Sequence, residues 1–154
     1  MTHEPITSLL HRQAITDAIH TYCRGVDTID VDIVAALFTE DCVVDYGPGL
    51  GVPTRGRDNI AERLRRGLPR FAATSHQVSN IEITFGDDDV SASSITYLNA
   101  WHRYSDGRPD AVLWARYHDR WVLDGARWLI AERILRVAGQ ENFDVEWYPI
   151  GRRS

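Results

Sequence analysis

The chain lacks the features that identify several common classes of protein. It has only two cysteines in 154 residues, Cys23 and Cys42, and they are too few and too far apart to indicate a metal site or a disulfide framework. No apolar run approaches the roughly 20 residues that span a bilayer, and no basic segment followed by an apolar one opens the sequence. We therefore expect a cytoplasmic protein with no membrane partner.

Signatures of nucleotide, metal and nucleic-acid binding are also missing. The sequence has no Gly-rich phosphate loop, no His-x-x-x-His pair and no nucleophile elbow. Its net charge of −5, without a stretch of basic residues interleaved with aromatic ones, argues against a nucleic-acid partner. The basic run 63–66 alternates with acidic residues on one predicted helix, which is typical of a solvated face. We expect no metal, no cofactor and no nucleic acid.

What the sequence does contain is the pattern of one globular domain. A length of 154 residues with 44% hydrophobic content is enough to bury roughly two-thirds of the unfolded surface. No repeat or Pro/Gly linker divides it, so we expect a single domain over 1–154, with a core at about 6–136 and a tail at 137–154. Apolar spacing and capping residues predict helices over 6–26, 31–38 and 58–68, with a short strand at 42–46.

The second half of the chain has the character of extended structure. Turn signals, with Asp124–Gly125 the strongest among them, separate four predicted strands at roughly 74–86, 89–105, 110–122 and 127–138. Helices followed by an antiparallel meander predict an α+β domain, in which three N-terminal helices pack against a cone-shaped, curved antiparallel sheet. Such a sheet encloses a pocket, and an apolar pocket with a few polar groups is the default small-molecule site.

An imidazole and a carboxylate are the strongest candidates for chemistry. His76 lies near the start of a predicted strand, whose apolar pattern changes parity near Ser79–Asn80 and so indicates a bulge. Asp27 follows the first predicted helix. Each has an ordinary interpretation, as a strand-end histidine bonded to backbone and as a helix or turn cap. If the fold brings them together, Asp27 would fix the tautomer of His76 and raise its basicity, making a general base that needs no metal.

Three further side chains are placed to face the same pocket. Tyr22 is on the apolar face of the first helix, either as a core tyrosine or as a donor to a developing oxyanion. Tyr46 ends the short strand next to Asp45, and only one of these two neighbours can point inward. Alternation places His102 on a strand face of small residues that would leave room for a ligand.

Weaker candidates are in the last two strands. His118, with Arg116 on the same side of its strand, is a possible pocket residue. Arg116 or Arg133 could anchor an anionic or carbonyl group, or could pair with Glu132 or Asp119 instead. The sequence does not choose between these alternatives.

Taken together, the residues resemble a SnoaL-like domain of the nuclear-transport-factor-2-like superfamily. The branch that they resemble holds scytalone dehydratase, hexachlorocyclohexane dehydrochlorinase and bile-acid 7α-dehydratase, and the resemblance extends from about Ile6 to Arg136. Its markers are Tyr22 with Gly25–Val26–Asp27, Ala36–Asp41 leading to Val44–Tyr46, His76 with Asn80, and Asp124–Trp128.

The resemblance implies roles for individual residues. Asp27 and His76 match the Asp–His dyad of the dehydratases and the dehydrochlorinase, and Tyr22 matches a tyrosine of the bile-acid enzyme. Tyr46 is where scytalone dehydratase has a pocket tyrosine, His102 lies near that enzyme's second histidine, and Arg133 is the nearest counterpart of a C-terminal arginine. Ketosteroid isomerase keeps its basic aspartate at the position of Tyr46, so that mechanism is not reproduced here.

The resemblance further implies a cone-shaped α+β barrel that assembles as a homo-oligomer, a trimer or a dimer. The tail 141–150 mixes aromatic residues with acids, and it would either close the pocket or cross to a neighbouring subunit. The expected function is a cofactor-independent lyase, a dehydratase or dehydrohalogenase acting on a small hydrophobic hydroxylated or halogenated substrate. An isomerase or a polyketide- or steroid-type cyclase in the same pocket, and a non-catalytic ligand-binding domain, remain the alternatives.

Overall fold

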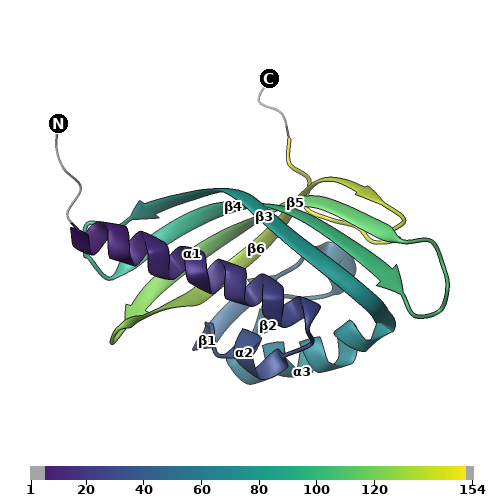
Figure 1. Cartoon of the computed structure of the whole chain (residues 1–154), viewed down its shortest axis with the longest axis horizontal. Helices are drawn as coiled ribbons and strands as arrows, with labels where there is room; N and C mark the ends of the chain where they lie inside the picture. Colours follow the sequence, from purple (N-terminus) through teal and green to yellow (C-terminus); the bar gives the residue numbers. More distant parts are fainter. Residues whose placement is uncertain (1–5, 152–154) are drawn as a thin grey trace.

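The computed structural model describes residues 6–151 as an α+β fold, in which helices cover one face of a curved sheet (Figure 1). The helices are α1 (Ile6–Asp27), α2 (Val31–Ala35) and α3 (Arg57–Gly67), with short 3-10 turns η1 (Pro48–Leu50) and η2 (Leu68–Arg70). The strands are β1 (Phe38–Asp45), β2 (Thr54–Arg55), β3 (Phe71–Phe85), β4 (Ser91–Tyr104), β5 (Ala111–Asp124) and β6 (Arg127–Glu141).

These strands form one six-stranded sheet in the order β2-β1-β6-β5-β4-β3. Strands β3 to β6 make the predicted antiparallel meander, whereas β1 pairs in parallel with β6. The sheet bends around its contents but does not close, because β2 and β3 are edges that do not pair with each other. The α+β class and the three-helix arrangement are therefore confirmed, with an open curved sheet in place of a closed barrel.

The helices cover the concave face of the sheet. Helix α1 crosses it diagonally in Figure 1, and its apolar stripe buries Ile15, Ile19 and Tyr22 against residues of the sheet. Asp30 caps α2 as predicted, accepting a hydrogen bond from the backbone of Ile33 at 3.2 Å. The predicted second helix is too long: α2 ends at Ala35, because Phe38 already pairs with Ile130 of β6.

A break in β3 sets which of its residues face the helices. The register with β4 shifts between Ser79 and Glu82, and Asn80 has a φ of 47°, so the predicted bulge is confirmed. Without the bulge, strand alternation could not turn both His76 and Ile81 towards the inside. The extra residue therefore allows β3 to turn His76 towards the cavity and, further along, Ile81 and Ile83 towards the core.

The C-terminal tail folds back onto the open end of the molecule. Pro149 forms a β-bridge with Val137, and the backbone N–H of Gly49 donates to the carbonyl of Glu146 at 3.0 Å. Phe143 and Trp147 pack on the core cluster. Among residues 6–151, no helix has the length and apolar character that a bilayer-spanning segment requires.

Candidate active site

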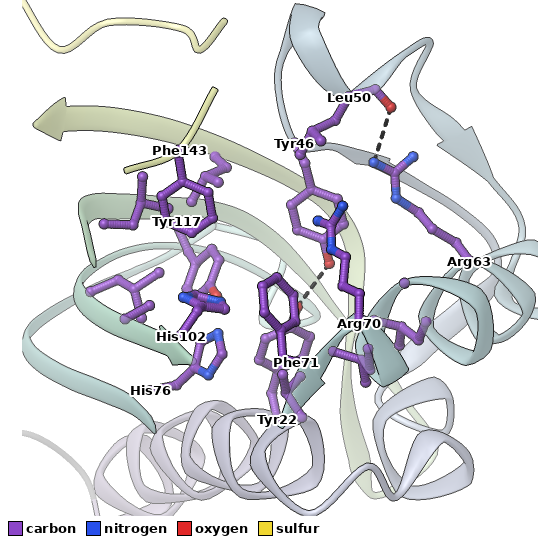
Figure 2. A pocket seen from close by; sticks show the side chains of 18 of the residues that line it. Tyr22, Tyr46, Leu50, Arg63, Arg70, Phe71, His76, His102, Tyr117 and Phe143 are labelled. Atoms are coloured by element: carbon purple, nitrogen blue, oxygen red, sulfur yellow. Dashed lines mark hydrogen bonds between the residues drawn. The ribbon is translucent and has the colours of Figure 1, made fainter. Parts of the chain in front are cut away.

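A cavity of about 350 Å³ lies between the concave face of the sheet, the helices and the tail (Figure 2). Aliphatic and aromatic side chains form most of its wall, including Val26, Leu98, Leu113 and Leu135. A few polar groups converge on it, from α1, the residue after β1, α3, β3 and β4. This is the composition expected of a site for a small hydrophobic molecule.

Asp27 and His76 meet at the wall of this cavity. His76 Nδ1 is 2.7 Å from Asp27 Oδ1, and the backbone N–H of His76 donates to Asp27 Oδ2 at 2.9 Å. The Thr74 hydroxyl donates to Asp27 Oδ1 at 2.7 Å. The imidazole side chain is only 8% exposed, and it lines the cavity. The sequence therefore indicated a pair that the fold does bring into contact, from the end of α1 and the start of β3.

The hydrogen bonds determine the state of the pair. Burial alone would raise the pKa of Asp27, but the bonds from the His76 ring, the His76 backbone and Thr74 outweigh it and hold that pKa below its usual value. An ionised carboxylate only accepts hydrogen bonds, so His76 Nδ1 carries the proton. The lone pair is then on Nε2, the ring nitrogen opposite the carboxylate, which is the one left for a molecule in the cavity.

Two tyrosines form the second polar group of the cavity. The hydroxyl oxygens of Tyr22, from α1, and Tyr46, which follows β1, are 2.8 Å apart, as the dashed line in Figure 2 marks. Burial raises the pKa of Tyr46 well above its usual value, and so does its closeness to Tyr22, which keeps its hydroxyl protonated. The hydrogen bond between the two tyrosines uses one of their two hydroxyl protons, so the second O–H remains available to donate to a ligand.

Arg133 lies behind the tyrosines, not in the cavity wall. It is fully buried and makes a bidentate ion pair with Asp119, at 2.8 Å for each bond. Its guanidinium is stacked between the rings of Tyr22 and Tyr117, with Cζ at 4.1 and 4.0 Å from the ring centroids. The sequence left open whether Arg133 anchors a ligand or pairs with Glu132 or Asp119. In the structure it pairs with Asp119 and does not line the cavity.

His102 lies across the cavity from the tyrosines, beside His76. Their ring centroids are 5.3 Å apart in an edge-to-face arrangement, and Phe71 and Phe143 enclose His102 further. Burial, with a smaller effect of the His76 charge, lowers the pKa of His102 to about 4, so this imidazole is neutral near pH 7. Its Nδ1 is buried without a hydrogen-bond partner among the described residues. Because this atom is fully covered, a ligand would contact the rest of the ring, which lines the cavity.

Two of the weaker candidates face away from the cavity. Along β5 the buried side chains are the odd-numbered ones, such as Leu113, Ala115 and Tyr117, so strand alternation turns Arg116 and His118 to the opposite face of the sheet. The Arg116 guanidinium is instead stacked 4.3 Å from the ring centroid of Tyr97. Neither residue lines the cavity, so the prediction that Arg116 and His118 are pocket residues is wrong.

Other contributors to the site were missed. Thr74, which holds Asp27, is two residues before His76 on the same strand face, and this spacing is the signal that could have identified it. Arg63 was assigned to a solvated helix face, yet it is half-buried, lines the cavity and donates to the Leu50 carbonyl at 3.1 Å. Phe143 and Trp147 of the tail line the cavity too, so the tail closes the pocket of its own chain.

Comparisons with known proteins agree with this fold. The sequence profile of the SnoaL-like domain family matches residues 7–134. A scytalone dehydratase-like protein from Novosphingobium aromaticivorans DSM 12444 is 34% identical, with a TM-score of 0.89 over 96% of this chain and 98% of its own. No curated protein sequence matches at a significant level.

More distant structures share the fold. An aromatic ring hydroxylase-like protein, also from Novosphingobium aromaticivorans, is 26% identical, with a TM-score of 0.79 over 90% of this chain and 95% of its own. A hexachlorocyclohexane dehydrochlorinase from Novosphingobium barchaimii LL02 is 17% identical, with a TM-score of 0.80 over 94% of this chain and 99% of its own. At that identity the likeness concerns the fold alone, and these neighbours are named for different activities.

Proposed function

The chain belongs to the SnoaL-like domain family, and we propose that it is a lyase that eliminates water or a hydrogen halide from a small hydrophobic substrate without a cofactor. A scytalone dehydratase-like protein at 34% identity supports an elimination in preference to other chemistries of the fold. The observation that carries the proposal is the bond between His76 Nδ1 and Asp27 Oδ1, 2.7 Å long, at the wall of an apolar cavity.

His76 is the proposed base. Its Nε2 takes the proton from the carbon next to the one that bears the leaving group, and the C–H electron pair becomes the new C=C bond. Asp27 holds the ring in the tautomer that leaves Nε2 free and stabilises the imidazolium that forms. General-base help of this kind is typically worth about 10²–10⁴-fold in rate, or roughly 3–5 kcal/mol.

The tyrosine pair is the proposed acid. The O–H that Tyr22 and Tyr46 do not use between themselves points at the charge that develops on a leaving hydroxyl or on a carbonyl oxygen. If hydroxide leaves, it departs with the C–O electron pair, accepts this proton and becomes water, while His76 returns its proton to the tyrosinate. The substrate loses one water in all, and no oxidant or reductant is needed. A halide would leave as the anion, with its proton on His76.

The neutral His102 and the buried Arg133 support this arrangement. His102 contributes a neutral imidazole ring to the cavity wall beside His76, which helps to orient the substrate. The guanidinium of Arg133, stacked 4.1 Å from the Tyr22 ring centroid, places positive charge behind the tyrosine that would bear the developing negative charge. These are positioning and electrostatic contributions; the proton transfers themselves involve only His76 and the tyrosines.

The test compares two histidine variants on a panel of small cyclic alcohols and chlorides, with products followed by mass spectrometry. His76→Gln should lower turnover about 10²–10⁴-fold. His118→Gln is the matched control, because His118 is on the outer face of the sheet, and it should stay near wild type. Products of unchanged mass would favour the isomerase or cyclase alternative, and ligand binding without any turnover would favour the binding domain. Full activity in His76→Gln would refute the proposal.

A further inference from the structure

The cavity has an uneven distribution of charge. Three arginines contribute to its lining, Arg63 and Arg66 from α3 and Arg70 from η2, while no aspartate or glutamate does. The chain as a whole carries 22 acidic and 17 basic residues, so the absence of acidic residues among the charged residues of the lining does not follow from its average composition. Arg63 and Arg70 are on the α3 side of the cavity in Figure 2, and the two imidazoles are on the other side.

Arg63 is held in place without losing its charge. Its guanidinium donates to Thr54 Oγ1 at 3.2 Å and to the Leu50 carbonyl at 3.1 Å, and it lies over the Tyr46 ring with Cζ at 5.3 Å from the centroid. All of these partners are neutral. The bonds therefore orient the guanidinium but leave its positive charge uncompensated.

Arg70, from η2, lines the same side of the cavity as Arg63. It is exposed, and its Cζ is stacked 4.8 Å from the ring centroid of Phe71, which is itself a cavity residue. Within residues 6–151 it forms no ion pair, in contrast to Arg65, which binds Asp32 at 2.7 Å on the outside of α3. Its charge reaches into the cavity, since it is one of the groups that lower the pKa of His102.

We propose that the natural substrate is an apolar acid, whose carboxylate is bound between Arg63 and Arg70 at the cavity mouth while its hydrocarbon body fills the cavity. The proposal rests on the lyase function above and adds the class of substrate. A carboxylate at the mouth keeps part of its hydration, so its burial costs little, while the apolar body gains from the apolar wall. Anchoring one end also decides which carbon reaches His76.

The experiment measures binding by titration calorimetry, with naphthoate as the acidic probe and naphthamide as its neutral analogue of nearly the same shape. Wild type should bind naphthoate more tightly. Arg63→Gln and Arg70→Gln should each weaken naphthoate by about three- to tenfold, as expected for partly exposed ion pairs, and change naphthamide less than about twofold. The neutral probe shows whether the cavity is intact in each variant.

Arg65→Gln is the matched control, because it removes a positive charge from the same helix outside the cavity. It should leave both affinities near wild type. Raising the salt concentration should weaken naphthoate but not naphthamide. Equal affinities for the two probes, absent binding of naphthoate, or an equal loss in Arg65→Gln would overturn the proposal.

Binding needs no turnover, so this test fails or succeeds independently of the lyase assay. Selective naphthoate binding together with undiminished turnover in His76→Gln would reject the proposed elimination and leave the acid-binding mouth standing. If wild type binds naphthoate and naphthamide equally well while His76→Gln loses turnover, the acid-binding mouth is rejected and the proposed elimination stands.

Discussion

Replacing Asp27 with asparagine is the sharpest perturbation of the proposed base, because it changes one atom and leaves the shape of the side chain. Asp27 accepts three hydrogen bonds, at 2.7 Å from Thr74, 2.9 Å from the His76 backbone and 2.7 Å from His76 Nδ1. An asparagine oxygen can still accept the backbone bond. Its NH₂ group, however, would face the Thr74 hydroxyl and His76 Nδ1, which donate in the wild type.

The amide should therefore reverse the tautomer of His76. An NH₂ group donates, so Nδ1 has to accept and the proton moves to Nε2, the nitrogen that the mechanism needs as a base. We expect kcat/KM to fall about 10²–10⁴-fold, the range typical of a general base, which corresponds to roughly 3–5 kcal/mol. Nitrogen NMR of the His76 ring should report the change directly, as a protonated Nε2 in Asp27→Asn.

Stability should respond as well, with a characteristic pH dependence. Exchanging charge-assisted hydrogen bonds for poorly matched ones should cost about 1–3 kcal/mol near pH 7. The folded-state pKa of Asp27 is depressed, so its stabilisation is present above the unfolded value of about 3.9 and is lost as pH falls through the folded value. The free energies of unfolding of wild type and Asp27→Asn should thus converge in acid.

Asp17→Asn is the control for both measurements, since Asp17 is exposed on the same helix and, within residues 6–151, its side chain bonds to Gln13 alone. It should change neither turnover nor the pH dependence of unfolding appreciably. The reasoning is refuted if Asp27→Asn keeps kcat/KM within about threefold of wild type, because a general base of this kind contributes far more.

Two other substitutions test the framework around the site. Arg133→Met leaves Asp119 buried without its partner and should cost about 3–5 kcal/mol in denaturant unfolding; the double variant Arg133→Met with Asp119→Asn should recover part of this loss, and no recovery would contradict the ion-pair argument. Gly49→Ala would place a Cβ against the backbone of Glu146, 2.7 Å from its oxygen, and should speed amide hydrogen exchange in residues 142–150. Gly151→Ala, where a Cβ meets nothing within 4 Å, should not, and equal exchange in the two variants would show that Gly49 does not hold the tail.

The sequence predicted those parts of the fold that local patterns encode. Apolar spacing located α1, and the change of parity in β3 located the bulge after Ser79. The end of α2 was missed because it depends on pairing between Phe38 and Ile130, which are distant in sequence. Local propensity cannot weigh a contact of that kind.

In the candidate site, too, residue positions could be predicted from the sequence, but contacts between distant segments could not. Asp27 and His76 were singled out by residue type and position, and the resemblance matched them to a known dyad. Their contact depends on how α1 crosses the sheet, which periodicity does not encode. The placement of His118 was an avoidable error, since Tyr117 and Trp121 already gave β5 an inward parity that excludes it. The role of Arg63 depends on its hydrogen bond to the Leu50 carbonyl, a contact between separate segments that the turn signal at Gly47–Pro48–Gly49 does not predict.

The tail connects the two ends of the proposed site. Phe143 packs edge-to-face on His102, at 5.1 Å between ring centroids, and Trp147 packs on Phe143 at 5.7 Å. The same segment is tied at Glu146 to Gly49, next to the Leu50 carbonyl that holds Arg63. The residues that exclude water from the imidazoles and the turn that orients the anchoring arginine are therefore one packed unit. A substrate that binds the arginines should stabilise the closed tail, and with it the dry surroundings in which a proton transfer to His76 is most effective.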